Sequence, residues 1–329
     1  MAIHIRRREL LVTLGGAAAW PLAARAQQTA GRIWRLGVLS PAAPPDPLVE
    51  AMRLRLRELG YIDGRNIVFE YRWGEGKLDR LTDLARELVG SKVDVITTLS
   101  TPAALAARNA TTTIPIVFTA VGDPVGSGVV PSLARPGGNA TGTSLLATEL
   151  SAKRLELVRE IVPGISRVAM LWNDTNPSMV LRAHETEGAA TKLGVIIQSI
   201  GVHDLIDFDA AFGTIESSRA DALLTLVDPF TLKHRERIVD FAAPRHLPAI
   251  YEAREFVQSG GLVSYGPSLV ASQWRAAEYV DKIFKGAKPA DLPVEQPVKF
   301  ELLINMKTAR ALSLAIPSSV MLRADEVIE

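Results

Sequence analysis

The chain alternates short, mainly apolar runs with segments in which apolar residues recur every three or four positions. The run at 114–118 is unbroken, which is typical of a strand covered on both faces, as in parallel sheets, and the runs at 33–39 and 93–99 are also expected to be strands. A further strand at 67–73 alternates apolar residues with polar or small ones. Helical spacing is followed by Leu48, Met52, Leu56 and Leu59, and by Leu81, Leu84, Leu88 and Val89. This order predicts a parallel sheet with helices on its faces.

A loop rich in glycine and proline interrupts the pattern near the middle of the chain. The run at 114–118 leads into Asp123, which can cap a helix, and Pro124, which can occupy the first turn of that helix. The glycine-rich segment 136–142 follows. A polar loop at the carboxyl end of a strand, followed by a flexible crossing, is typical of a binding cleft beside a hinge. One more βα loop of an α/β enzyme explains the same residues, so both interpretations stay open.

The alternation of strands and helices restarts after this loop. Strands are expected at 168–172, 195–200, 222–227, 249–251, 262–265 and 300–304, and helices at 149–162, 207–215, 271–285 and 306–312. Further helices are expected between Asn176 and Gly194 and from Asp228 to Ala243. The chain is therefore an α/β protein with two similar βα halves, and its 329 residues suit about two domains.

The first 26 residues differ in character from the rest. Three arginines at 6–8 precede a mildly apolar segment at 10–20, and Ala24-Arg25-Ala26 follows. This order is typical of a secretory signal cleaved after Ala26, and the paired arginines favour the twin-arginine route. Cleavage removes four arginines and one glutamate, so the formal charge falls from +1 to −2. The basic excess belongs to the signal, which leaves nucleic-acid binding without support.

Composition excludes several other kinds of site. The chain has no cysteine, which rules out disulfides, thiolate metal sites, a cysteine nucleophile and a lipid-modified cysteine at the cleavage point. The five histidines lie far apart without metal-ligand spacing, and no phosphate loop, dinucleotide fingerprint or nucleophile elbow is present. We therefore expect no catalytic residue, no metal and no cofactor. Carboxylates in loops remain open as acids or bases, and equally as ligands for an amino group or helix caps.

One local pattern recurs where strands hand over to helices. A capping oxygen stands before proline at Thr101-Pro102, Asp123-Pro124, Asn176-Pro177 and Asp228-Pro229. Each pair places a helix N-terminus at the carboxyl edge of a sheet, where open α/β folds bind ligands and where a carboxylate group is favoured. Any single pair is also an ordinary helix cap. Tyr251 and Tyr265, near Gly260-Gly261, either stack on an aromatic ligand or fill core space.

The order of short motifs resembles a known family. The matching stretches are Leu36-Gly37-Val38-Leu39-Ser40, 51–61, 100–104, Val121-Gly122-Asp123-Pro124-Val125, 134–139, Ile250-Tyr251, Glu255-Phe256-Val257, Gly260-Gly261-Leu262, Ser264-Tyr265-Gly266 and 285–291. Together they cover residues 33–329. This order is similar to that of ABC-transporter substrate-binding proteins of the tryptophan/tyrosine-binding-like group, which have a type I periplasmic binding protein fold.

The resemblance implies two Rossmann-like lobes joined by three crossings, with a ligand between them. Lobe 1 would hold 31–143 plus 261–292, and lobe 2 would hold 144–260 plus 293–329. The ligand-binding positions that it implies are Ser40, Thr101, Ala120, Asp123 and Ser144 on or near lobe 1, faced by Asn173, Asp228 and Tyr251. The implied ligand is a small molecule such as an amino acid or an aromatic or carboxylate compound.

The resemblance also implies a periplasmic receptor that delivers its ligand to an ABC transporter permease in the inner membrane. We expect a monomer that is free in the periplasm. Two alternatives remain open. One is a secreted α/β enzyme that uses the carboxylate of Asp123 or Asp228, and the other is the ligand-sensing module of a signalling system.

Export gives the first testable prediction. N-terminal sequencing of the exported protein should begin at Gln27, because cleavage after Ala26 is the outcome that Ala24-Arg25-Ala26 predicts. Changing Arg7 and Arg8 together to lysine should block export, as judged by immunoblots of cell fractions. A double variant that is exported normally would contradict the twin-arginine assignment.

Overall fold

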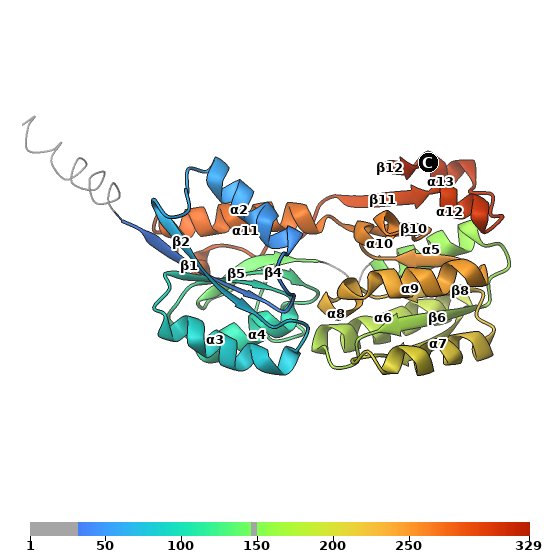
Figure 1. Ribbon diagram of the computed structural model, residues 1–329, viewed down its shortest axis with the longest axis horizontal. Coiled ribbons are helices and arrows are strands. Elements are labelled where there is room, and N and C mark those ends of the chain that lie inside the picture. The colour runs from blue at the N-terminus through green and yellow to red at the C-terminus, as the bar shows by residue number, and fades with distance from the viewer. Residues whose placement is uncertain (1–31, 146–149) are drawn as a thin grey trace, which may run out of the picture.

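A computed structural model of the chain describes residues 32–145 and 150–329, which form two parallel-sheet bodies side by side along the long axis of the molecule (Figure 1). The first sheet has five parallel strands in the order β2-β1-β3-β4-β5. These strands are β1 (Trp34–Ser40), β2 (Ile67–Trp73), β3 (Val95–Leu99), β4 (Ile116–Val121) and β5 (Ala140–Ser144). Its strand order confirms the parallel sheet that the apolar runs predict.

Helices cover both faces of the first sheet. On one face lie α3 (Leu81–Gly90) and α4 (Thr101–Ala110), whose leucines and alanines join the same core cluster as Ile96 and Phe118. The other face carries α2 (Pro47–Glu58) and α11 (Leu269–Phe284), which pack against Val38 and Val95. Helix α11 comes from late in the chain, and in Figure 1 it lies in orange among the blue and cyan elements. We call this body the first lobe.

The second sheet has seven strands in the order β12-β11-β10-β9-β8-β6-β7. These are β6 (Arg167–Trp172), β7 (Ile196–Gly201), β8 (Ala222–Thr225), β9 (Ala249–Tyr251), β10 (Val263–Pro267), β11 (Phe300–Asn305) and β12 (Glu326–Ile328). All neighbouring pairs are parallel except β10 and β11, which are antiparallel. We call this sheet and its helices the second lobe.

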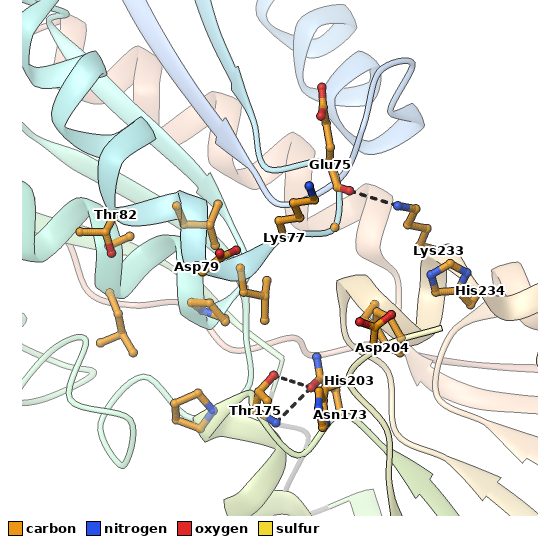
Figure 2. A pocket seen from close by; sticks show the side chains of 18 of the residues that line it. Glu75, Lys77, Asp79, Thr82, Asn173, Thr175, His203, Asp204, Lys233 and His234 are labelled. Carbon is orange, nitrogen blue, oxygen red and sulfur yellow. Dashed lines mark hydrogen bonds between the residues drawn. The ribbon is translucent and has the colours of Figure 1, made fainter. Parts of the chain in front are cut away.

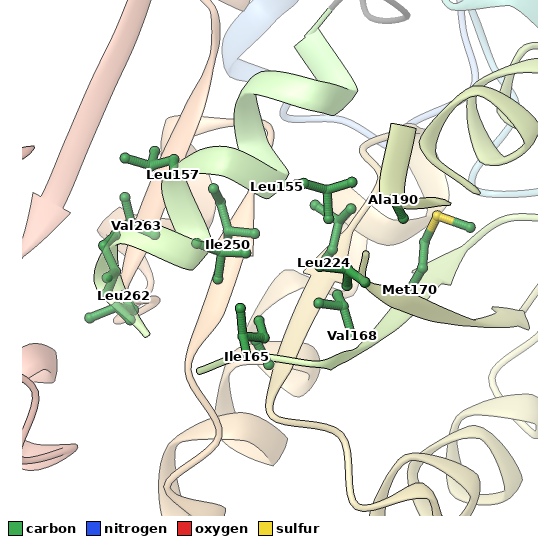
Figure 3. Packing of buried hydrophobic residues seen from close by; sticks show 14 of the residues in the cluster. Leu155, Leu157, Ile165, Val168, Met170, Ala190, Leu224, Ile250, Leu262 and Val263 are labelled. Carbon is green, nitrogen blue, oxygen red and sulfur yellow. The ribbon is translucent and has the colours of Figure 1, made fainter. Parts of the chain in front are cut away.

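Helices also cover both faces of the second sheet. One face carries α5 (Leu150–Ile161), α6 (Pro177–Leu193), α12 (Met306–Ala311) and α13 (Ser318–Met321). The other carries α7 (Asp207–Ser218), α8 (Pro229–Lys233), α9 (Arg235–Ala242) and α10 (Arg254–Gln258). Figure 3 shows Leu155 and Leu157 of α5 above Val168, Leu224 and Ile250 of the strands. This apolar stripe is the reason that α5 docks on the sheet.

The chain passes between the two lobes three times. It runs from β5 of the first lobe to α5 of the second, returns to the first lobe between β10 and α11, and crosses again before β11. The expected helix start at Glu149 and the expected signal at residues 1–26 lie outside the described residues.

The expected lobe boundaries need correction at two places. The segment from 261 was assigned to lobe 1, but Val263–Pro267 pairs with β9 and β11 of the second sheet. Gly261 is not at a hinge: a Cβ there would lie 2.5 Å from the ring of Tyr251, so close packing requires the glycine. The segment from 293 was assigned to lobe 2, yet the Val294 amide donates to Leu133 O and the Ser144 amide to Glu295 O. We propose crossings between β5 and α5, at about 268 and at about 296–299.

The approach of β5 to β4 depends on one glycine. Gly142 has a φ of +152°, and a Cβ there would lie 1.9 Å from the carbonyl oxygen of Phe118. The β4–β5 register shifts between Phe118 and Val121, so this contact belongs to an irregularity of β4 at its carboxyl end. The irregularity includes Ala120, which has a φ of +55°.

Replacing this glycine should therefore destabilise the fold. We expect Gly142→Ala to lower the free energy of unfolding by roughly 2 kcal/mol or more, because the new methyl group meets backbone that has no room to move. Gly188→Ala on α6 is the matched control: a Cβ there meets nothing within 4 Å, so the change should stabilise by about 0.5–1 kcal/mol. Urea denaturation measures both. Equal midpoints for Gly142→Ala and the parent would contradict this account.

Candidate functional site

Two neighbouring cavities lie between the lobes. The inner cavity, of about 260 Å³, is lined by the ends of β1, β3 and β4 from the first lobe and by residues 227–229, Leu232, Lys233 and Arg235 from the second. The outer cavity, of about 750 Å³, lies between residues 75–82 and α4 on one side and Asn173, Thr175, His203 and Phe230 on the other (Figure 2). Lys233 lines both cavities. The carboxyl ends of two parallel sheets therefore face each other across a space that a small molecule can fill.

On the first lobe, Ser40 and Asp46 form one wall of the inner cavity. Asp46 caps α2 by accepting from the Leu48 amide at 2.9 Å, and Ser40 Oγ donates to its other oxygen at 3.2 Å. Burial raises the pKa of Asp46, while these hydrogen bonds act in the opposite direction. Proline residues 41, 45 and 47 surround the pair and fix the loop that presents it.

The next two strands of the first lobe end in strained backbone. Ser100, directly after β3, has a φ of +113°, and Ala120 of β4 has a φ of +55°. Non-glycine residues in such conformations cost about 1–3 kcal/mol each and persist only where the surroundings impose them. Ser100 is held by its amide, which donates to Thr119 O at 3.0 Å, and by its Oγ, which accepts from Ala103. Both strained residues line the inner cavity, which favours a functional use for this edge.

On the second lobe, Asp228 forms the opposite wall and is saturated with hydrogen-bond donors. Its Oδ1 accepts from the amides of Phe230 at 3.0 Å and Thr231 at 2.9 Å, and caps α8. Its Oδ2 accepts from Asn173 Nδ2 at 2.7 Å and Asn176 Nδ2 at 3.3 Å. Burial raises the pKa of Asp228, and the four donors oppose that rise. The carboxylate therefore organises the edge of the second lobe with all of its acceptor positions in use.

A buried ion triad holds the backbone next to Asp228. Glu252 lies between the guanidinium groups of Arg154 and Arg182, and each of the three side chains is 1% exposed. Glu252 accepts from the Val227 amide at 2.7 Å, and Arg182 donates to the Val227 carbonyl at 3.1 Å. Burial lowers the pKa of both guanidinium groups to about 9, so both stay charged at neutral pH. Both backbone polar groups of Val227, which lines the inner cavity, are thus fixed from within the lobe.

The structure brings only some of the sequence-predicted site residues to the cavities. Ser40, Ala120 and Asp228 line the inner cavity, and Asn173 lines the outer one. The other four line neither cavity: Thr101, Asp123, Ser144 and Tyr251. We retain the first four as proposed ligand contacts.

The remaining four residues have structural contacts. Thr101 is buried in the first turn of α4, and Asp123 accepts from the amides of Val125 and Gly126. Ser144 donates to Gly122 O at 3.2 Å near the first crossing. Tyr251 is 1% exposed and stacks on Phe256, with ring centroids 4.6 Å apart. Of the two open interpretations of Tyr251, the core role is the one that the packing supports.

Sequence reasoning missed several lining residues. Asp46-Pro47 repeats the acid–proline pattern of Asp228-Pro229, so this signal was present in the sequence. Lys233 follows Pro229 by one helical turn and Arg235 begins the next helix, but charged residues on short helices show no sequence pattern that distinguishes a cavity wall from an exposed surface. The triad gave a weak signal: Arg154 lies among the apolar positions that α5 buries.

Two further properties bear on the type of protein. Within the described residues, no group of three histidine, aspartate or glutamate side chains is placed to hold a metal ion. No helix in the same part of the chain is long and apolar enough to cross a membrane.

Two α/β lobes with a cavity between their sheet edges define a two-lobe ligand-binding protein of the type I periplasmic class.

The family follows from a match that spans most of the chain. The family model described as "ABC transporter substrate binding protein" matches residues 46–328, so the chain belongs to that family. A curated relative, the "Tyrosine-binding protein" of Clostridioides difficile strain R20291, is 29% identical over 260 residues, which are 79% of this chain and 74% of that protein.

Solved structures agree with this assignment. A conserved domain protein of Vibrio cholerae has a TM-score of 0.84 at 29% identity, over 90% of this chain and 100% of its own. An ABC domain in complex with L-Trp from "Streptococcus pneumonia" has a TM-score of 0.83 at 26% identity, with the same coverage. The leucine-binding protein LivK of Thermotoga maritima has a TM-score of 0.60 at 14% identity over 85% of this chain and 87% of its own, and shows the shared fold.

The donor set around Asp228 gives a prediction about stability. Asp228→Asn should lower the free energy of unfolding by about 1–3 kcal/mol, because in either amide orientation the new NH₂ group faces other donors. The double variant Asn173→Asp/Asp228→Asn should recover much of this loss, since the amide at 228 then donates to the carboxylate at 173. Thermal and urea melts compare the three proteins. A single variant as stable as the parent, or a double variant less stable than the single, would contradict the assigned hydrogen bonds.

Proposed function

We propose that this protein is a periplasmic receptor that captures one amino acid or aromatic carboxylate in the inner cavity and delivers it to the permease of an ABC importer. It binds its ligand without converting it, acts as a monomer and is exported with its signal cleaved. The class of transport protein follows from family membership. The ligand class, the permease, the monomeric state and the export route are parts of the proposal.

The observation that carries the proposal is the lining of the inner cavity. Both lobes contribute, and most of the wall is apolar: prolines, alanines and the leucines 48, 99, 145, 232 and 269. Charged groups of both signs interrupt it, namely Asp46 and Asp228 on the acidic side and Lys233 and Arg235 on the basic side. An apolar chamber with a few charged groups suits a small zwitterion or organic acid with an apolar side chain.

The volume of the cavity agrees with a ligand of this size. A space of about 260 Å³ corresponds to roughly nine water molecules at about 30 Å³ each, which suits a compound of about ten to fifteen non-hydrogen atoms. The tyrosine-binding protein of Clostridioides difficile and the solved complex with L-Trp are named for amino acids of that size.

The positions of the carboxylates favour binding over turnover. Both oxygens of Asp228 already accept hydrogen bonds from the protein, and Asp123 lines neither cavity. A general base needs a free acceptor within reach of its substrate. The alternative of an enzyme that works through these two residues therefore has little geometric support.

Closure of the lobes is the expected response to ligand. The Lys233 ammonium of the second lobe donates to Glu75 O of the first lobe at 3.1 Å, which links the lobes across the cleft (Figure 2). A ligand that contacts both walls stabilises this closed arrangement by its differential affinity for it.

Calorimetric titration with L-tyrosine, L-tryptophan, L-leucine and benzoate tests the proposal. We expect one-to-one binding of at least one compound with a Kd of about 1 μM or tighter, equivalent to about −8 kcal/mol. At a hundred times Kd the ligand should stabilise the protein against unfolding by about 2.7 kcal/mol. Mass spectrometry after overnight incubation should recover the ligand unchanged. No binding in the whole panel would refute the proposed ligand class, and a converted ligand would point to an enzyme.

A further inference from the structure

The acidic and basic groups that line the inner cavity differ in how many hydrogen bonds they can still form with a ligand. The carboxylates of Asp46 and Asp228 already accept from donors within their own lobes. A ligand ammonium would therefore have to share acceptors that are in use. The charged groups of the inner cavity that remain for an ionic contact with a ligand are therefore the cations, Lys233 and Arg235.

The two cations of the inner cavity differ in how they are held. Arg235 donates from Nε to Ser259 Oγ at 3.1 Å and from Nη1 to Leu232 O at 3.1 Å, and it lies 3.7 Å from the carboxylate of Glu236. Lys233 has a single hydrogen bond, to the neutral carbonyl of Glu75, and forms no ion pair with any residue that the structure describes. An ammonium group carries three donors, so two of them remain for a ligand.

Lys233 also occupies the boundary between the two cavities. It projects from the end of α8, close enough to Gly76 that a Cβ there would lie 2.8 Å from the ammonium nitrogen. The carboxylate of Glu75 turns away toward Arg80, to which it is paired at 3.2 Å. Figure 2 shows the ammonium reaching the Glu75 carbonyl from the opposite lobe. An anion at this boundary would contact Lys233 of the second lobe directly. Because Lys233 also donates to Glu75 O, the lysine would link that anion to the first lobe.

We propose that Lys233 binds the carboxylate of the ligand and sets the preference of the cavity for acids over the corresponding amines. This assignment rests on the proposed function, since it names the group that recognises the acid. A charged donor that faces a carboxylate makes a stronger hydrogen bond than one that faces a carbonyl. The contact with Glu75 positions the ammonium before the ligand arrives, and it couples recognition of the acid to closure of the lobes.

The test uses calorimetry to compare each acid with an amine or alcohol that lacks its carboxylate, on matched variants. The pairs are L-tyrosine with tyramine, L-tryptophan with tryptamine, L-leucine with isoamylamine and benzoate with benzyl alcohol. The variants are Lys233→Met, which keeps length without charge, and Lys233→Arg, which keeps the charge. Lys77→Met is the control, because Lys77 is a lysine that lines only the outer cavity.

For the acid that binds the parent, Lys233→Met should weaken affinity by roughly 10- to 150-fold and leave the neutral or amine partner within about twofold. Lys233→Arg should recover part of the loss, and Lys77→Met should match the parent. Equal weakening of acid and partner would mean that Lys233 only links the lobes, and an unchanged acid affinity would refute the assignment outright. A parent that binds none of the acids would refute the proposed function together with this inference, whereas either of the other failures leaves the proposed function standing.

Discussion

The ion triad of Arg154, Glu252 and Arg182 is the interaction on which the binding side of the second lobe depends. It joins α5, α6 and the segment after β9, and through Tyr265 O it also reaches β10. Helix α5 follows the first crossing and β10 precedes the second, so the triad connects the two elements of the second lobe that flank these crossings. Breaking such a pair by removing one partner costs about 3–5 kcal/mol, because a charge is left buried without its counterion.

The same triad makes the cleft edge of that lobe rigid. Val227 is held at both of its backbone polar groups, and Asp228 beside it is held by four donors. The triad carries two positive charges and one negative, and the negative charge of Asp228 favours the charged form of Arg182. The charge of Asp228 is therefore balanced within the protein. This is the physical reason to assign it an organising role and to look for ligand recognition at Lys233.

The cleft edge of the first lobe is fixed by backbone conformation and not by buried charges. Strain at Ser100 and Ala120 is imposed by the sheet, and Gly142 allows β5 to approach the irregular end of β4. Asp46 and the prolines near it complete the wall. One lobe thus presents a wall fixed by buried charge and the other a wall fixed by backbone geometry. Because both walls are preformed, fewer side chains and loops have to be ordered on binding, so the loss of conformational entropy is smaller.

The sequence predicted the fold well because the fold rests on local periodicity. Continuous apolar runs indicated the parallel strands, and the restart after residue 142 indicated the second lobe. The boundary at Gly261 was wrong because a glycine needed for packing against Tyr251 has the same appearance in a sequence as a hinge glycine. Asp228 was singled out by its position before a proline at the end of a strand, whereas Ser40 was implied only by the family resemblance.

The rest of the site depends on contacts between residues far apart in the chain. Arg154 and Glu252 are separated by 98 positions, and Lys233 and Glu75 by 158, so no local pattern records either contact. Tyr251 shows the same limit, since the register of the sheet decides whether an aromatic residue at a strand end faces the core or the cleft.

Closure of the lobes on a ligand is the central claim, and a distance measurement between them tests it most directly. The chain has no cysteine, so Asp83→Cys on α3 and Asp209→Cys on α7 provide two unique spin-label sites. Their parent side chains are 79% and 84% exposed and lie on different lobes (Figure 1). Pulsed electron resonance should show a broad distance distribution without ligand, and a shorter, narrower one when the tightest-binding compound of the calorimetric panel is saturating. Identical distributions with and without that compound would contradict the account.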